Sequence, residues 1–130
     1  MTVSGTPKPL PLYAALLCAV ALPLHAETSI ENSLDEINEH FAIASEHYGD
    51  GKVQLHTRSD GQAGSRHTVY TFNCKEQTFR SDYDGETAPE RFPAGDFQEP
   101  SEPVTQGGSV APMAQYACAE HGHPLLEWRW

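Results

Sequence analysis

The 130-residue sequence contains only three cysteines and few basic side chains. Eight lysines and arginines are set against 18 aspartates and glutamates, so that the net charge at pH 7 is −10. A surface of this charge repels the phosphates of nucleic acids and the headgroups of anionic lipids. We therefore expect neither nucleic acid nor an anionic membrane surface among the partners of this protein.

The sequence also lacks the short motifs that mark common catalytic and metal sites. It has no His-Glu-x-x-His segment, no pair of Cys-x-x-Cys segments and no serine in a Gly-x-Ser-x-Gly turn. The cysteines that remain after export are expected to be oxidised, which removes them as nucleophiles. We therefore expect no catalytic residues, no cofactor and no enzymatic activity.

An uncharged apolar segment lies near the N-terminus. It covers residues 12–24, Lys8 precedes it, and Ala26 supplies a small residue at a plausible cleavage point. Because the run is short for a membrane span, this layout predicts a secretory signal peptide over residues 1–26. An uncleaved anchor and a lipid attached to Cys18 are the alternatives.

Cleavage after Ala26 leaves two cysteines, Cys74 and Cys118, in a chain with seven basic and 18 acidic residues, so that its net charge is −11. An even pair of cysteines in an exported chain predicts a disulfide. Free thiols and an intermolecular bond are the alternatives. The chain-entropy model assigns about 4 kcal/mol to closing a loop of this length.

The beginning of the mature chain predicts an amphipathic helix over residues 29–48, within an N-terminal segment at 27–51. Apolar residues recur there at steps of three and four, acidic residues lie between them, and Gly49 is a natural end. The stripe consists of Ile30, Leu34, Ile37, Phe41, Ala44 and Tyr48. We interpret it as a face that packs on the core, and a partner-binding helix is the alternative.

The remainder, residues 52–130, predicts strands followed by a helix. Alternating or β-branched residues predict strands over 52–57, 66–73 and 77–83, and residues 126–130 alternate again. Four prolines make 86–106 a loop with at most one short strand. A helix opens at about Ser109, and its apolar face consists of Val110, Met113, Ala114 and Ala117.

These elements predict an α+β fold. We expect an antiparallel sheet with the C-terminal helix packed on one face and tied to it by the Cys74–Cys118 disulfide. The N-terminal amphipathic helix is expected in addition to this unit.

Two pairs of residues near the C-terminus are candidate binding residues. His121 and His123 offer two imidazoles to a metal ion, with Glu120 or Glu127 as a third ligand, but we interpret them as solvated histidines in the turn after the helix. Trp128 and Trp130 are either anchors for a partner or part of an edge strand that packs on the sheet, and we favour the edge strand.

Several segments resemble the surface-adhesin protein E family, and the likeness covers about residues 52–119. They are Thr71-Phe-Asn-Cys-Lys-Glu-Gln-Thr-Phe-Arg80, Tyr83-Asp-Gly85, Glu99-Pro100 and Gly108-Ser-Val-Ala-Pro-Met-Ala-Gln-Tyr-Ala-Cys118. The resemblance implies export from a Gram-negative bacterium and an antiparallel sheet with a helix tied on by the disulfide. It also implies an adhesive role at the cell surface. The chain departs from the family where a helix is predicted in place of N-terminal strands.

We therefore expect an exported, non-catalytic binding protein, adhesin-like, in the periplasm or at the cell surface, whose partner is a protein or an envelope component. A periplasmic inhibitor or accessory factor that docks on another envelope protein is the first alternative. A metal-binding protein or enzyme that uses His121 and His123 is the second.

Overall fold

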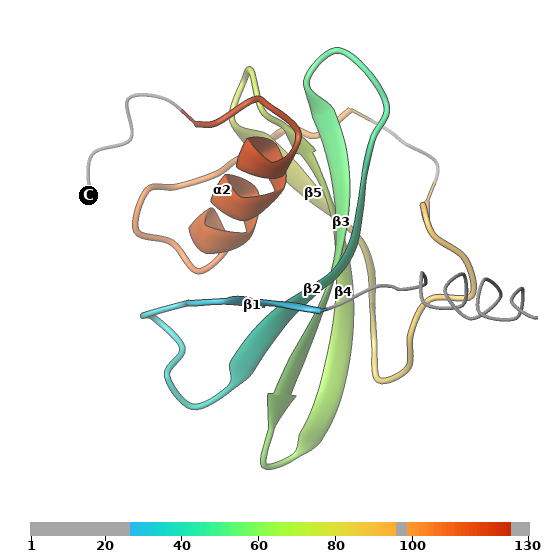
Figure 1. The fold of residues 1–130 in the computed structure, drawn as a ribbon, viewed down its shortest axis with the longest axis vertical. Helices are drawn as coiled ribbons and strands as arrows, with labels where there is room; N and C mark the ends of the chain where they lie inside the picture. The colour runs from blue at the N-terminus through green and yellow to red at the C-terminus, as the bar shows by residue number, and fades with distance from the viewer. Residues whose placement is uncertain (1–26, 96–98, 126–130) are drawn as a thin grey trace, which may run out of the picture.

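The computed structural model describes residues 27–95 and 99–125, which form a six-stranded antiparallel sheet with a helix on one face (Figure 1). The strands lie in the sheet in the order in which they occur in the chain, so each pairs with its sequence neighbours. The elements are β1 (Thr28–Ile30), β2 (Glu39–His47), β3 (Lys52–Gly61), β4 (Gly64–Asn73), β5 (Thr78–Gly85), β6 (Glu102–Pro103) and α2 (Ala111–Glu120).

The predicted strands over 52–57, 66–73 and 77–83 are confirmed as β3, β4 and β5, and the predicted C-terminal helix is confirmed as α2. The loop at 86–106 carries one short strand, β6, as expected. Within the described residues, no helix has both the length and the apolar character needed to cross a membrane. The predicted signal peptide at 1–26 and the predicted last strand at 126–130 lie outside the described residues.

The main core lies between the sheet and α2. Val53, Leu55 and Phe72 point from the central strands toward the helix and are at most 1% exposed. The helix meets them with small or slender side chains, namely Ala111, Met113, Ala114 and Ala117. Small side chains let the helix backbone approach the sheet closely, so the large residues of the sheet supply most of the buried apolar surface.

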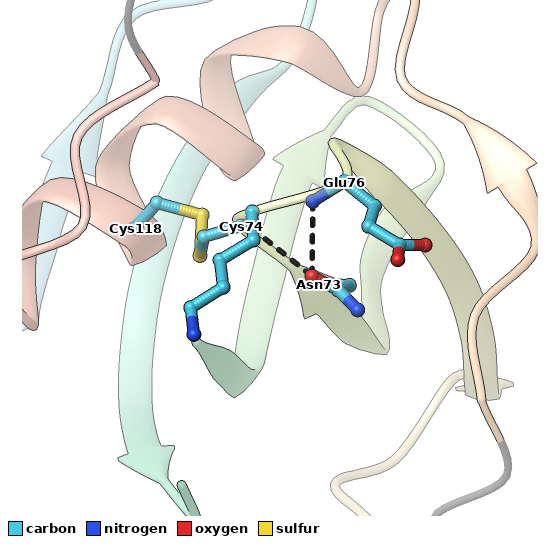
Figure 2. Close-up of a disulfide and its surroundings, with 5 residues drawn as sticks. Asn73, Cys74, Glu76 and Cys118 are labelled. Atoms are coloured by element: carbon cyan, nitrogen blue, oxygen red, sulfur yellow. Dashed lines mark hydrogen bonds between the residues drawn. A yellow bond between two sulfur atoms is a disulfide. The ribbon is translucent and has the colours of Figure 1, made fainter. Parts of the chain in front are cut away.

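The predicted Cys74–Cys118 disulfide is confirmed. Cys74 directly follows β4, and Cys118 lies in the last turn of α2 (Figure 2). Next to the bridge, Asn73 Oδ1 accepts hydrogen bonds of 3.0 Å from the backbone N–H groups of Lys75 and Glu76 (Figure 2). The Cys74 N–H donates to the Gly51 carbonyl at 2.8 Å. The bridge therefore joins the helix to a firmly held end of the sheet.

The predicted amphipathic helix over residues 29–48 is wrong. The structure has strands β1 and β2 there, joined by a loop over residues 31–38 that projects below α2, at the lower left of the fold (Figure 1). Of the predicted apolar stripe, Ile30 is buried in the core, whereas Leu34 and Ile37 are 61% and 81% exposed. The segment at 27–51 is thus part of the sheet.

Residues that favour turns end the first strand early. Asn32 Oδ1 accepts a hydrogen bond from the Leu34 N–H at 3.1 Å, and Asp35 Oδ1 accepts one from the Asn38 N–H at 3.3 Å. Side chains of this type compete with helical hydrogen bonds and are favoured in turns. The helical period of the apolar residues is therefore overridden locally.

Pairing with β3 decides the conformation of the rest of this segment. Strand β2 pairs with β3 from Glu39 to His47, and a bulge between Ala42 and Ala44 shifts the register. The bulge interrupts the two-residue alternation of the strand. Because of this interruption, the sequence of β2 does not show the regular alternation of a strand, and the helical period is the stronger signal.

The second face of the sheet is covered by the irregular segment after β5, which lies on the side away from α2 (Figure 1). Gln54 of β3 is fully buried there. Its Oε1 accepts a hydrogen bond from the Ala94 N–H at 2.5 Å, and its Nε2 donates to the Ala94 carbonyl at 2.7 Å and to Thr71 Oγ1 at 3.0 Å. The Thr71 hydroxyl donates in turn to Asp82, which also pairs with Arg80. One buried amide thus fastens the segment to the sheet.

We expect Gln54→Met to destabilise the fold by about 2–4 kcal/mol, because the Ala94 N–H and carbonyl lose their partner and stay buried. Urea denaturation measures this loss. Hydrogen exchange should show the Ala94 amide opening first. The exposed Gln62 in the β3–β4 turn provides the matched control, and Gln62→Met should change stability by less than about 0.5 kcal/mol. Equal effects of the two substitutions would contradict the assigned role of Gln54.

We expect the double substitution Cys74→Ala, Cys118→Ala to lower the free energy of unfolding by about 2–4 kcal/mol. The bridge spans 44 residues of sequence, and its loss restores conformational freedom to the unfolded chain. The alanine-rich face of α2 has little surface of its own, so its amides should lose exchange protection before those of β3 and β4. An unchanged melting temperature, or free thiols in the native protein, would contradict this prediction.

Candidate functional site

The β1–β2 loop, residues 31–38, displays apolar side chains to solvent. Among the large hydrophobic residues of the described chain, Leu34 and Ile37 are the exposed ones, at 61% and 81%. Single exposed aliphatic residues are ordinary on a protein surface. Two of them, three residues apart on one loop, offer apolar area that a partner can cover.

Hydrogen bonds within the loop hold its shape. The Asp35 N–H donates to the Asn32 carbonyl at 3.0 Å. The carboxylate of Asp35 accepts from the Asn38 side-chain amide at 3.1 and 3.2 Å and contacts His40 Nε2 at 2.8 Å. These hydrogen bonds, first that from Asn38 and then that from His40, hold the pKa of the Asp35 carboxyl below its ordinary value. The charged form of Asp35 therefore stabilises the conformation of the loop.

Two contacts seat the loop on the rest of the domain. Asn32 is 9% exposed, and its Nδ2 donates to the Ser109 carbonyl, just before α2, at 3.1 Å. At the other end, Asn38 lies against Gly61 at the β3–β4 turn, so closely that a Cβ atom at position 61 would overlap its side-chain oxygen. The loop is therefore held against the rest of the domain, and it presents Leu34 and Ile37 in defined positions.

The surroundings of the two aliphatic residues are acidic. Glu31, Glu36 and Glu39 are exposed on the loop or directly after it, and the sequence has no lysine or arginine from residue 27 to residue 51. A cavity of about 580 Å³ lies between the loop and α2. Its lining consists of Glu31, Asn32, Ser33, Glu36, Pro112 and Gln115. The loop, the cavity and the N-terminal half of α2 together form what we call the acidic loop surface.

The acidic loop surface was not predicted from the sequence. The helical period places Leu34 and Ile37 on a stripe that we interpret as a core face, so the sequence does not reveal their exposure. The signal that marks the loop is the presence of four turn-forming residues around and between the two aliphatic ones, namely Asn32, Ser33, Asp35 and Asn38.

The structure also places the residues that the sequence singled out. Cys74 and Cys118 form the disulfide. His121 is the C-cap of α2, and His123 follows two residues later, close to His47 at the end of β2. Trp128 and Trp130 lie outside the described residues.

Comparison of the chain with family models, with curated proteins and with solved structures gives no match. The resemblance to the surface-adhesin protein E family therefore stays a prediction.

A separate histidine pair lies on the second face of the sheet. His56 of β3 is 6% exposed, and its Nε2 lies 2.9 Å from Nδ1 of His67 on β4. Its ring also lies beside that of Phe92, at 6.1 Å between centroids. Burial, followed by the nearby His67 and Arg58, lowers the pKa of His56 to about 4. His56 is buried and His67 only partly so, and we interpret neutral His56 as a structural residue.

We expect this histidine to make the fold acid-sensitive. Between the unfolded pKa of 6.5 and the folded value of about 4, the unfolded chain binds the proton of His56 more readily than the folded chain does. Stability is therefore full above about pH 6.5 and falls as the pH drops toward 4, by about 2–3 kcal/mol. The difference between the urea midpoints of the wild type and of His56→Gln, followed over this range, isolates the effect. Parallel pH profiles would contradict it.

Proposed function

We propose that this protein is an exported, non-catalytic binding protein of the bacterial envelope or cell surface, and that the acidic loop surface is its contact site for a partner protein. The observation that carries this proposal is the exposure of Leu34 and Ile37 on a loop held in place by hydrogen bonds. Two aliphatic side chains in water add nothing to the stability of the folded protein. Covering them with a partner, in contrast, makes the free energy of binding more favourable.

The chemistry of the surface defines the partner. Covering Leu34 and Ile37 requires an apolar patch, and the carboxylates of Glu31, Glu36 and Glu39 around them require basic side chains. A protein segment that combines lysine or arginine with aliphatic or aromatic residues has both properties. The same carboxylates repel anionic lipid headgroups, which disfavours a membrane as the occupant.

The compartment in the proposal has two supports. The Cys74–Cys118 disulfide fits an oxidising environment, such as the periplasm or the cell exterior. The apolar segment at residues 12–24 has the layout of a signal peptide. Within this compartment the partner is either a host ligand, as for an adhesin, or another envelope protein, as for an inhibitor or accessory factor.

Photo-crosslinking in the producing cell tests the contact site. A photoreactive amino acid at position 37 should give a specific adduct, because Ile37 is 81% exposed on the loop. The same amino acid at the exposed position 62, in the β3–β4 turn, is the matched control and should give none. An adduct with a bacterial envelope protein identifies an accessory or inhibitory role, and an adduct formed only when host ligands are added identifies an adhesin.

Substitutions in the acidic loop surface should abolish binding without unfolding the domain. For Leu34→Ser combined with Ile37→Ser, we expect at least a tenfold loss of affinity for the crosslinked partner, with a change in unfolding free energy of less than about 0.5 kcal/mol per site. Glu31→Lys combined with Glu36→Lys should weaken the complex and remove its dependence on salt.

The control for charge is Glu76→Lys, which reverses an exposed carboxylate in the turn between β4 and β5. It should leave the affinity unchanged. Equal crosslinking at positions 37 and 62, or full affinity in the Leu34 and Ile37 variant, would refute the proposed contact site.

A further inference from the structure

Three histidines from two distant parts of the chain meet near the disulfide end of the sheet. His47 is the last residue of β2, His121 caps α2, and His123 follows in the next turn. The ring centroid of His47 lies 5.8 Å from that of His121 and 5.2 Å from that of His123. The sequence showed only the pair at 121 and 123, because His47 was assigned to a helix.

The backbone conformation after α2 fixes the positions of His121 and His123, from which two of these rings project. The Gly122 N–H donates to the Ala119 carbonyl at 3.1 Å, and the His123 N–H donates to the Cys118 carbonyl at 2.8 Å. With Gly122 at φ +82°, this is a Schellman ending of a helix. Because Cys118 is also bonded to Cys74, the turn that carries His121 and His123 is held to the helix by hydrogen bonds and to the sheet through the disulfide.

The third ring belongs to a residue of the sheet, His47 of β2. His47 pairs with Val53 in the β2–β3 register, and Val53 is fully buried. Ser45, two residues earlier on the same strand, places its Oγ 2.8 Å from Nε2 of His121. When Nε2 of His121 carries its proton and donates it to this hydroxyl, Nδ1 is left with a free lone pair. Histidines that bind metal ions are oriented by a partner on their other nitrogen in this way.

The distances from the ring of His47 to the other two rings are close to those found in a metal site. Zinc–nitrogen bonds of about 2 Å at tetrahedral angles place the centroids of two ligating imidazoles about 5 Å apart. The ring nitrogens do not yet surround a common point, since within the described residues no group of three His, Cys, Asp or Glu side chains has the geometry to hold an ion. Rotation of the rings about their side-chain torsions is therefore required before their nitrogens can reach one ion.

We propose that His47, His121 and His123 bind a divalent transition metal ion, with zinc as the ion whose geometry fits best. Three neutral imidazoles are a ligand set that suits zinc and disfavours calcium and magnesium, which take oxygen ligands. The fourth position of the tetrahedron is taken by water or by a group of a bound partner. The net charge of −10 also favours cation binding.

The metal site is independent of the acidic loop surface. His121 and His123 lie at the C-terminal end of α2, whereas the loop is attached through Asn32 to Ser109 at the N-terminal end of the helix. A metal ion would add a second link between β2 and the turn after α2, next to the disulfide. Its binding and the binding of a partner at the loop are therefore tested separately.

The experiment uses the tag-free mature protein after treatment with a chelator. Calorimetric titration with zinc chloride should show one ion per chain, and titration with cobalt chloride should produce the visible absorption of tetrahedral cobalt. His47→Ala, His121→Ala and His123→Ala should each weaken zinc binding at least tenfold. Ser45→Ala should weaken it several-fold, because the orienting contact to His121 is lost.

His67→Gln is the matched control, since it removes an imidazole from the opposite face of the sheet, and it should leave zinc affinity unchanged. Circular dichroism of the metal-free variants verifies that each one folds, and a Gln variant replaces any Ala variant that does not. Absence of saturable zinc binding would overturn the proposal. Full affinity in the His47 variant would also overturn it, because binding would then involve only the two histidines of the turn.

Discussion

The covalent bond between Cys74 and Cys118 is the constraint on which the rest of this structure depends. The helix that it holds presents mostly alanines to the sheet, and such a face has too little apolar surface to hold a ten-residue helix strongly by itself. Once Cys118 is tied to the end of β4, Ala114 and Ala117 are kept against Leu55 and Phe72. The position of Ser109, which anchors the β1–β2 loop, and the positions of His121 and His123 follow from the same bond.

The second requirement is that both faces of the sheet are covered. Strand β3 serves both of them: Leu55 faces the helix, and its neighbour Gln54 holds the segment around Ala94 through hydrogen bonds. An apolar residue at position 54 could fill the same space, but it would leave the backbone N–H and carbonyl of Ala94 without hydrogen-bond partners. The polar amide therefore determines which part of a long irregular segment lies on the sheet. This segment contains four prolines between residues 86 and 106 and has little regular structure of its own.

Local sequence signals were sufficient for part of the fold and misleading for the rest. Strands β3 to β5 follow from β-branched and alternating residues, and α2 with its disulfide follows from the alanines and the cysteine pair, although the N-cap of α2 is Val110 and not the expected Ser109. The N-terminal strands could not be predicted in this way, because the spacing of Ile30, Leu34 and Ile37 imitates a helix. The contacts that decide against the helix lie outside the segment itself: β2 pairs with the following strand β3, and Asn32 donates a hydrogen bond to Ser109, far along the chain. The meeting of His47 with His121 and His123 depends on those same contacts, so the sequence shows the pair at 121 and 123 but neither the third histidine nor the acidic loop surface.

The outer strands of the described sheet are very short, with three residues in β1 and two in β6. Long open edges expose unpaired backbone groups, which invite strand addition and the growth of fibrils. β1 and β6 themselves therefore offer a foreign strand only a few hydrogen bonds, whatever their sequence. Side chains displayed by loops are another means of recognition, and substitutions can alter them without disturbing the sheet. In such a molecule, specificity can diverge quickly while the scaffold stays the same.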